Sequence, residues 1–166
     1  MRAFVAGALL TLANTTLLVA ADQSFDVSRV IDKGTAESVL GEKVKTPSPR
    51  NGAGKDGYYS KCNYYTENRR KSLVLRVQIP ATAAIDPMKE LELVAASSGP
   101  MKPVDGVGDK AEMFIGGGDS GAASRALMLY IAKGTAFVTI GIGGFDDESV
   151  ALDKAKEIAQ KILERL

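Results

Sequence analysis

Residues 73–79 place the strongest constraint on the fold of this chain, because apolar and polar side chains alternate there. One face carries Leu73, Leu75, Val77 and Ile79. The opposite face carries Arg76 and Gln78, and Pro80 ends the run. A period of two with one apolar face is typical of an antiparallel strand that covers a core. The chain is therefore expected to build a sheet with one buried face.

Four further segments are predicted as strands, namely 58–65, 111–115, 125–131 and 136–142. In the first of them, alternation puts Tyr58, Ser60, Cys62 and Tyr64 on one face. The other face carries Tyr59, Lys61, Asn63 and Tyr65, and its more polar character predicts that it looks outward. Lys133-Gly134 is read as the hairpin between the last two strands. The glycine- and proline-rich segments 45–57 and 101–109 are predicted as surface loops.

Three helices are predicted from capping residues and apolar spacing. The first ends at Leu40, with Asp32 or Thr35 as its N-cap and Gly41 at its end. The second begins at Asp86-Pro87, and the third begins at Asp146 or Asp147 and runs to the C-terminus. The predicted fold is α+β: a mainly antiparallel sheet of about five strands, packed with N-terminal, middle and long C-terminal helices.

The first 21 residues are predicted to be a cleavable signal peptide. Arg2 precedes an apolar run, small residues end the segment at Ala21, and no acidic residue occurs before Asp22. A transmembrane anchor is the alternative, but Asn14-Thr15-Thr16 interrupts the run. Residues 22–166 are then one domain, soluble in the periplasm or outside the cell and without a stable membrane anchor after cleavage.

Composition excludes several classes of function. The chain has 21 basic and 20 acidic residues, and Arg2 is lost with the leader, so no nucleic-acid or anionic-membrane partner is predicted. Cys62 stands alone and is predicted to be a buried, small apolar residue. Histidine is absent, which removes the usual general base and the commonest metal ligand. No cofactor and no metal site are predicted.

Two short motifs match known patterns without their required context. Gly118-Asp119-Ser120-Gly121 matches the nucleophile tetrapeptide of trypsin-like proteases, but no histidine is present to accept the serine proton. Residues 52–57 fit the dinucleotide pattern G-x-G-x-x-G, but they precede a strand instead of opening a helix. Neither motif is interpreted as a site.

Several short motifs follow one another along the chain: residues 36–44, Cys62-Asn63-Tyr64, residues 106–111 and Lys133-Gly134, followed by a closing helix. Together they resemble a family of small bacterial exported proteins and lipoproteins of unknown function with a PsbP-like α/β/α sandwich. The resemblance implies an antiparallel sheet between helices and brings no catalytic residue. This chain departs from the pattern in lacking a lipid-attachment cysteine and a second cysteine that could pair with Cys62.

The predicted contact surface is the outward face of 58–65 with the adjoining loops. An apolar concavity between the sheet and a helix is the alternative ligand site. Tyr59 and Tyr65 would offer amphipathic rings, and Arg69 and Arg70 would add charge beside them. The alternative is that these tyrosines only reflect strand propensity. The surface would contact an unidentified protein or small-molecule ligand.

The predicted function is that of an exported, non-enzymatic accessory or binding domain. One alternative is an enzyme that uses carboxylates or lysine, with Asp105, Asp109 and Lys110 as its candidate cluster. Another is a structural component of the cell envelope. Ionisable groups that converge in a closed pocket would favour the enzyme, whereas a solvated turn would favour binding.

Overall fold

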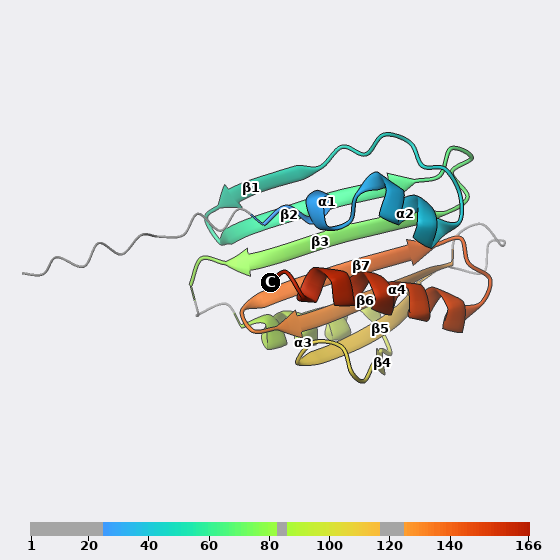
Figure 1. Cartoon of the computed structure of the whole chain (residues 1–166). Helices are drawn as coiled ribbons and strands as arrows, with labels where there is room; N and C mark the ends of the chain where they lie inside the picture. The colour runs from blue at the N-terminus through green and yellow to red at the C-terminus, as the bar shows by residue number, and fades with distance from the viewer. Residues whose placement is uncertain (1–24, 83–85, 117–124) are drawn as a thin grey trace, which may run out of the picture.

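The protein folds around a single antiparallel sheet, shown in Figure 1. The computed structural model describes residues 25–82, 86–116 and 125–166. Its strands are β1 (Arg50–Gly54), β2 (Gly57–Tyr65), β3 (Ser72–Pro80), β4 (Lys102–Pro103), β5 (Lys110–Gly116), β6 (Ala126–Lys133) and β7 (Ala136–Gly143). Its helices are α1 (Val27–Val30), α2 (Lys33–Leu40), α3 (Pro87–Ser98) and α4 (Glu148–Leu163).

The seven strands follow the order β1-β2-β3-β7-β6-β5-β4 across the sheet. Two antiparallel meanders, β1 to β3 and β4 to β7, therefore meet where β3 pairs with β7. In that pair Leu75 lies opposite Ile140 and Val77 opposite Val138. The alternation that predicted β3 is thus continued by β7 at the centre of the sheet.

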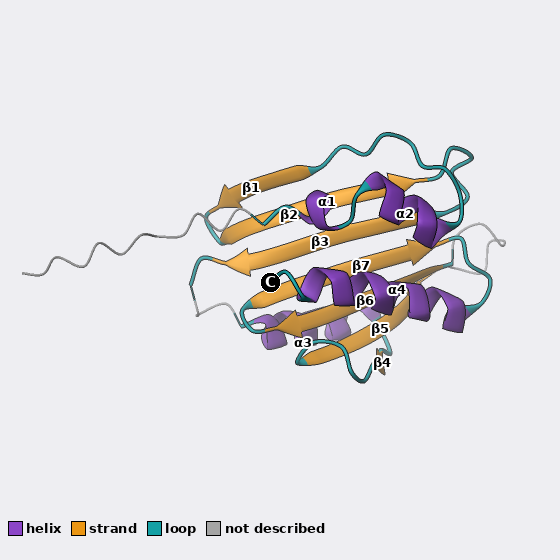
Figure 2. Cartoon of the chain, in the orientation of Figure 1, coloured by secondary structure: helices purple, strands orange, loops and turns teal. Residues whose placement is uncertain are grey.

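We call the face of the sheet that packs against α1, α2 and α4 the first face (Figure 2). Its core side chains from the strands are Cys62, Tyr64, Leu73, Leu75, Val77, Ala111, Met113, Leu127, Leu129, Ile131, Val138, Ile140 and Ile142. The helices contribute Val27, Ala36, Val39, Leu40, Ala151, Ala155, Ile158, Ala159 and Ile162. These residues form one hydrophobic cluster, as expected for a half-buried antiparallel sheet.

The opposite face, which we call the second face, is covered by α3 (Figure 1). This helix packs on β5, β6 and β7, where Leu91 and Phe137 are buried. It does not extend over β1 and β2, whose side chains on this face are exposed at Lys61 and Tyr65. The β1–β3 half of the second face is therefore open.

Capping residues fix the helix ends largely as the sequence predicts. The Asp32 carboxylate accepts a hydrogen bond from the Thr35 amide at 2.7 Å and begins α2, and Gly41 ends it in a left-handed conformation. Asp147 accepts a hydrogen bond from the Ser149 amide at 2.7 Å and begins α4. This last helix ends at Leu163, short of the predicted C-terminus.

The short helix α1 was not predicted, because a single turn of four residues is too short for apolar spacing to identify it. Tertiary contacts hold it. The Val27 amide donates to the Ser60 hydroxyl at 2.8 Å, and the Tyr64 hydroxyl donates to the Ile31 carbonyl. Ser60 and Tyr64 are both fully buried, so β2 supplies the polar partners that this segment needs.

The prediction of about five strands is too low, because both edge strands lie in segments predicted as loops. β1 falls within 45–57 and β4 within 101–109. The edge strand β1 does not pack against the core and therefore needs no apolar face. Its sequence lacks the alternation of apolar and polar residues by which strands are predicted. The predicted hairpin between β6 and β7 is present, with Gly134 and Thr135 as its two loop residues.

Two sequence predictions fall outside the described residues, namely the signal peptide at 1–21 and the motif Gly118–Gly121. Within the described ranges, none of the helices combines the length and the hydrophobicity that a bilayer span requires.

Candidate functional site

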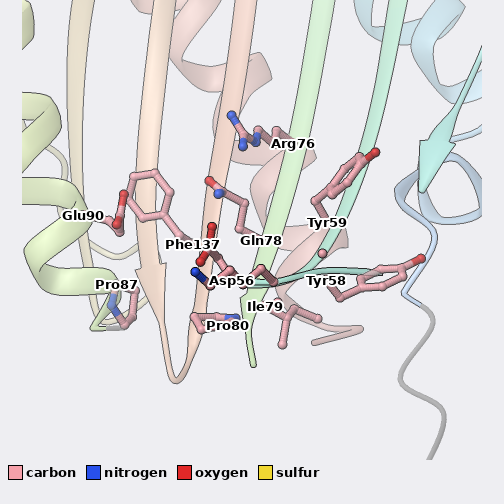
Figure 3. A pocket seen from close by; sticks show the side chains of 13 residues that line it. Asp56, Tyr58, Tyr59, Arg76, Gln78, Ile79, Pro80, Pro87, Glu90 and Phe137 are labelled. Carbon is pink, nitrogen blue, oxygen red and sulfur yellow. The ribbon is translucent and has the colours of Figure 1, made fainter. Parts of the chain in front are cut away.

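A groove of about 350 Å³ lies on the second face, where the open half of the sheet meets α3 (Figure 3). Tyr59 and Arg76 line it on the side of β2 and β3. Phe137 and Glu90 line it on the side of β7 and α3. The groove therefore combines two aromatic rings with charged groups of both signs.

Strand register brings the central groove residues together. Tyr59 on β2 lies opposite Gln78 on β3, and Gln78 lies opposite Phe137 on β7. Residues directly opposite on neighbouring strands share a face, so these three side chains form one row across the sheet. The Phe137 ring also stacks on Tyr130 of β6, with 6.3 Å between ring centroids. The ring that Phe137 contributes to the groove is thus itself packed against a second ring.

The β1–β2 hairpin closes one end of the groove, with Lys55 and Asp56 between the strands. A Cβ atom on Gly57 would lie 2.3 Å from the Ile79 carbonyl oxygen, and its φ of +133° is one that other residues rarely adopt. The Ala81 amide donates to the Asp56 carbonyl at 3.2 Å. The glycines that fit the dinucleotide pattern therefore serve a tight hairpin.

The structure separates the four predicted surface residues into two places. Tyr59 and Tyr65 are both exposed, at 41% and 45%, but they lie six residues apart on β2, which is about 20 Å. Tyr59 lines the groove, whereas Tyr65 lies at the other end of the strand. Arg69 and Arg70 are exposed in the turn after Tyr65. The groove thus includes only Tyr59 of the predicted set.

The cluster considered for an enzyme lies on an exposed turn. The Asp109 carboxylate accepts hydrogen bonds from the Lys133 ammonium at 2.8 Å and from the Gly134 amide at 2.6 Å. These bonds lower the pKa of Asp109, and the adjacent Glu112 raises the pKa of Lys110. Such a carboxylate is a weak base and such an ammonium a weak nucleophile. Their contacts stabilise the turn.

No group of three or more His, Cys, Asp or Glu side chains that could hold a metal ion occurs within the described ranges. Cys62 is fully buried on the first face, as predicted from its place in a strand. Burial raises the pKa of its thiol, so Cys62 is held as the neutral form. It contributes to the core of the first face and lies on the opposite side of the sheet from the groove.

Sequence reasoning missed most of the groove residues. Arg76, Gln78, Phe137 and Glu90 come from β3, β7 and α3, and no local motif joins them. The available signal was the polar side of β3, since Arg76 and Gln78 interrupt an apolar strand at alternate positions. Assembling the site also required the register of β2, β3 and β7.

No family model matches this chain, and no curated protein matches its sequence. The resemblance to small exported proteins with a PsbP-like sandwich thus remains a prediction. Among solved structures, the extracellular domain of PknH from Mycobacterium tuberculosis has a similar fold, with a TM-score of 0.54 and 11% sequence identity. The alignment covers 82% of this chain and 94% of that domain. At 11% sequence identity, the match shows a similarity of fold alone.

Proposed function

We propose that this protein is an exported, non-enzymatic binding domain and that the groove on the second face is its ligand site. The observation that carries the proposal is the open half of the sheet beside α3. A stable core has formed on the first face, yet a hollow with rings and charged groups remains on the second.

The dimensions and lining of the groove suit a small ligand or one segment of a longer one. Small-molecule sites commonly enclose about 300–1,000 Å³ and combine apolar walls with a few polar groups. Here Tyr59 and Phe137 supply the rings, and Gln78 supplies an amide between them. The site lies on strands, which hold side chains in more fixed positions than loops do.

Export is proposed from the leader pattern in residues 1–21, and the fold supports it. The PknH domain, which shares this architecture, is extracellular. Mass spectrometry of the protein made from the full chain tests this part of the proposal. We expect the exported form to begin at Asp22, and an intact N-terminus on protein retained in the cytoplasm would contradict export.

The groove is tested by screening the ¹⁵N-labelled exported protein against a library of small molecules and oligosaccharides. Ligands of this site should shift the backbone NMR signals of Tyr59, Gln78 and Phe137. A ligand at ten times its Kd should raise the thermal midpoint by a few degrees. Tyr59→Ala should weaken that ligand by about tenfold or more, because it removes one aromatic wall.

Tyr65→Ala is the matched control, because Tyr65 has nearly the same exposure on the same side of the same strand. It should leave binding unchanged. The groove is the wrong site if ligands shift signals elsewhere only, or if the two alanine variants weaken binding equally.

A further inference from the structure

Three cationic side chains lie side by side across the open half of the second face. Arg50 on β1 is directly opposite Lys61 on β2, and Lys61 is directly opposite Arg76 on β3. Directly opposite residues share a face, and neighbouring strands are about 4.8 Å apart. We call Arg50, Lys61 and Arg76 the basic row. It spans about 10 Å of backbone and crosses three strands.

Among the described residues, no carboxylate forms an ion pair with the basic row. All three residues of the row are exposed. Like charges directly opposite on neighbouring strands destabilise a sheet. The arrangement therefore costs some stability, although the chain as a whole carries almost balanced charge. An anion bound across the row would offset that repulsion.

The basic row continues into the groove. Arg76, the last member of the row, also lines the groove. The Tyr59 ring lies beside the row, close to β1: a Cβ atom on Gly52 would be 3.4 Å from that ring. A ligand that contacts all three cations can therefore extend past Arg76 towards Phe137. This geometry suits a linear ligand with several acid groups.

The side chains in the part of the groove beyond Arg76 restrict the chemical class of the ligand. Asp56 and Glu90 line it together with the Gln78 amide (Figure 3). Their carboxylates would repel further acid groups but would accept hydrogen bonds from hydroxyl groups. A chain made only of phosphates suits the basic row and not this part. A ligand with both acid and hydroxyl groups on rings suits both parts.

We propose that the open half of the second face binds an acidic oligosaccharide. Its acid groups contact Arg50, Lys61 and Arg76, and one sugar ring enters the groove between Tyr59 and Phe137. Hydroxyl groups of that ring donate to Asp56 and Glu90. This inference rests on the proposed function and adds the class of ligand to it.

The experiment titrates the ¹⁵N-labelled exported protein with tetragalacturonate at low salt. Maltotetraose serves as the neutral sugar and linear polyphosphate as the anion without sugar. We expect tetragalacturonate to bind most tightly, to shift the signals of Lys61, Arg76 and Gln78, and to bind more weakly as salt is raised. Lys61→Gln/Arg76→Gln should raise Kd by at least about tenfold, since it removes two charge-assisted contacts.

Lys161→Gln/Arg165→Gln is the control, because it removes the same two charges from exposed positions at the end of α4, the helix on the first face. It should raise Kd far less than the row variant does, because these side chains lie on the other side of the sheet and make no direct contact with the ligand. The row variant should also stay folded and be at least as stable as the wild type without ligand, because it relieves a like-charge contact.

Three results would overturn the inference: no binding of tetragalacturonate, equal loss of binding in the two double variants, or polyphosphate binding at least as tightly as the sugar. If maltotetraose shifts Gln78 and Phe137 while tetragalacturonate does not, the groove remains a ligand site and only the acidic class is wrong. If library ligands also fail to shift the groove signals, the proposed function itself fails.

Discussion

The two faces of the sheet are covered to different extents. On the first face α1, α2 and α4 pack over β2, β3, β6 and β7, and the strand side chains there are almost all fully buried. On the second face α3 packs mainly over β5, β6 and β7. Alternate residues of one strand therefore meet two environments: Tyr64 is fully buried, whereas Tyr65 beside it is 45% exposed.

This difference assigns separate tasks to the two faces. The apolar surface that stabilises the fold is concentrated on the first face, in the cluster that contains Leu75 and Ile140. The open half of the second face is consequently free to carry charge, a groove and exposed rings. A substitution on the first face should therefore change stability, and one on the open half should change binding.

The largest expected effect comes from adjacent residues of β3. Leu75→Ala should lower the free energy of unfolding by about 3 kcal/mol, because Leu75 is fully buried between Cys62 and Ile140 and the change leaves a cavity. Val74→Ala, on the second face, should cost less than about 1.5 kcal/mol, since Val74 is only half-buried. Urea unfolding of both variants measures the difference.

Equal losses for the two variants would show that the second face contributes as much to stability as the first. The two faces would then differ in how far helices cover them, but not in their contribution to the free energy of unfolding.

A smaller effect is expected from two adjacent tyrosines of β2. Tyr64→Phe removes the hydroxyl that donates to the buried Ile31 carbonyl and should cost about 1–2 kcal/mol of unfolding free energy. Tyr65→Phe removes an exposed hydroxyl that accepts a hydrogen bond from the side-chain amide of the half-buried Asn63 at 3.1 Å, and should cost less than about 0.5 kcal/mol. Urea unfolding again gives both values.

If Tyr65→Phe proved as costly as Tyr64→Phe, the open face would hold its side chains as firmly as the core does. The first face would then lose its special role in anchoring α1.

The sequence predicted what depends on local patterns. Alternation assigned Leu75 and Arg76 to opposite faces, and capping residues located the start of α2 at Asp32. It could not predict β1, whose pairing comes from β2 and not from its own side chains. Nor could it predict the basic row, because Arg50, Lys61 and Arg76 are far apart in sequence and meet only through strand register.

The smallest effect concerns the two helix caps on the first face. The backbone amide of Thr35 lowers the pKa of Asp32, and hydrogen bonds from Ser149 and the Val150 amide lower the pKa of Asp147. A carboxyl whose pKa is lower in the folded state stabilises the protein at pH values above its unfolded pKa of about 4. This stabilisation is lost as the pH falls through the folded pKa.

Asp32→Asn/Asp147→Asn keeps both caps, since asparagine also caps well, but removes the titration. Between about pH 5 and pH 2 its urea midpoint should fall less steeply than that of the wild type, with either single variant in between. Coinciding slopes would mean that the acid sensitivity of this protein arises away from the helices that cover the first face.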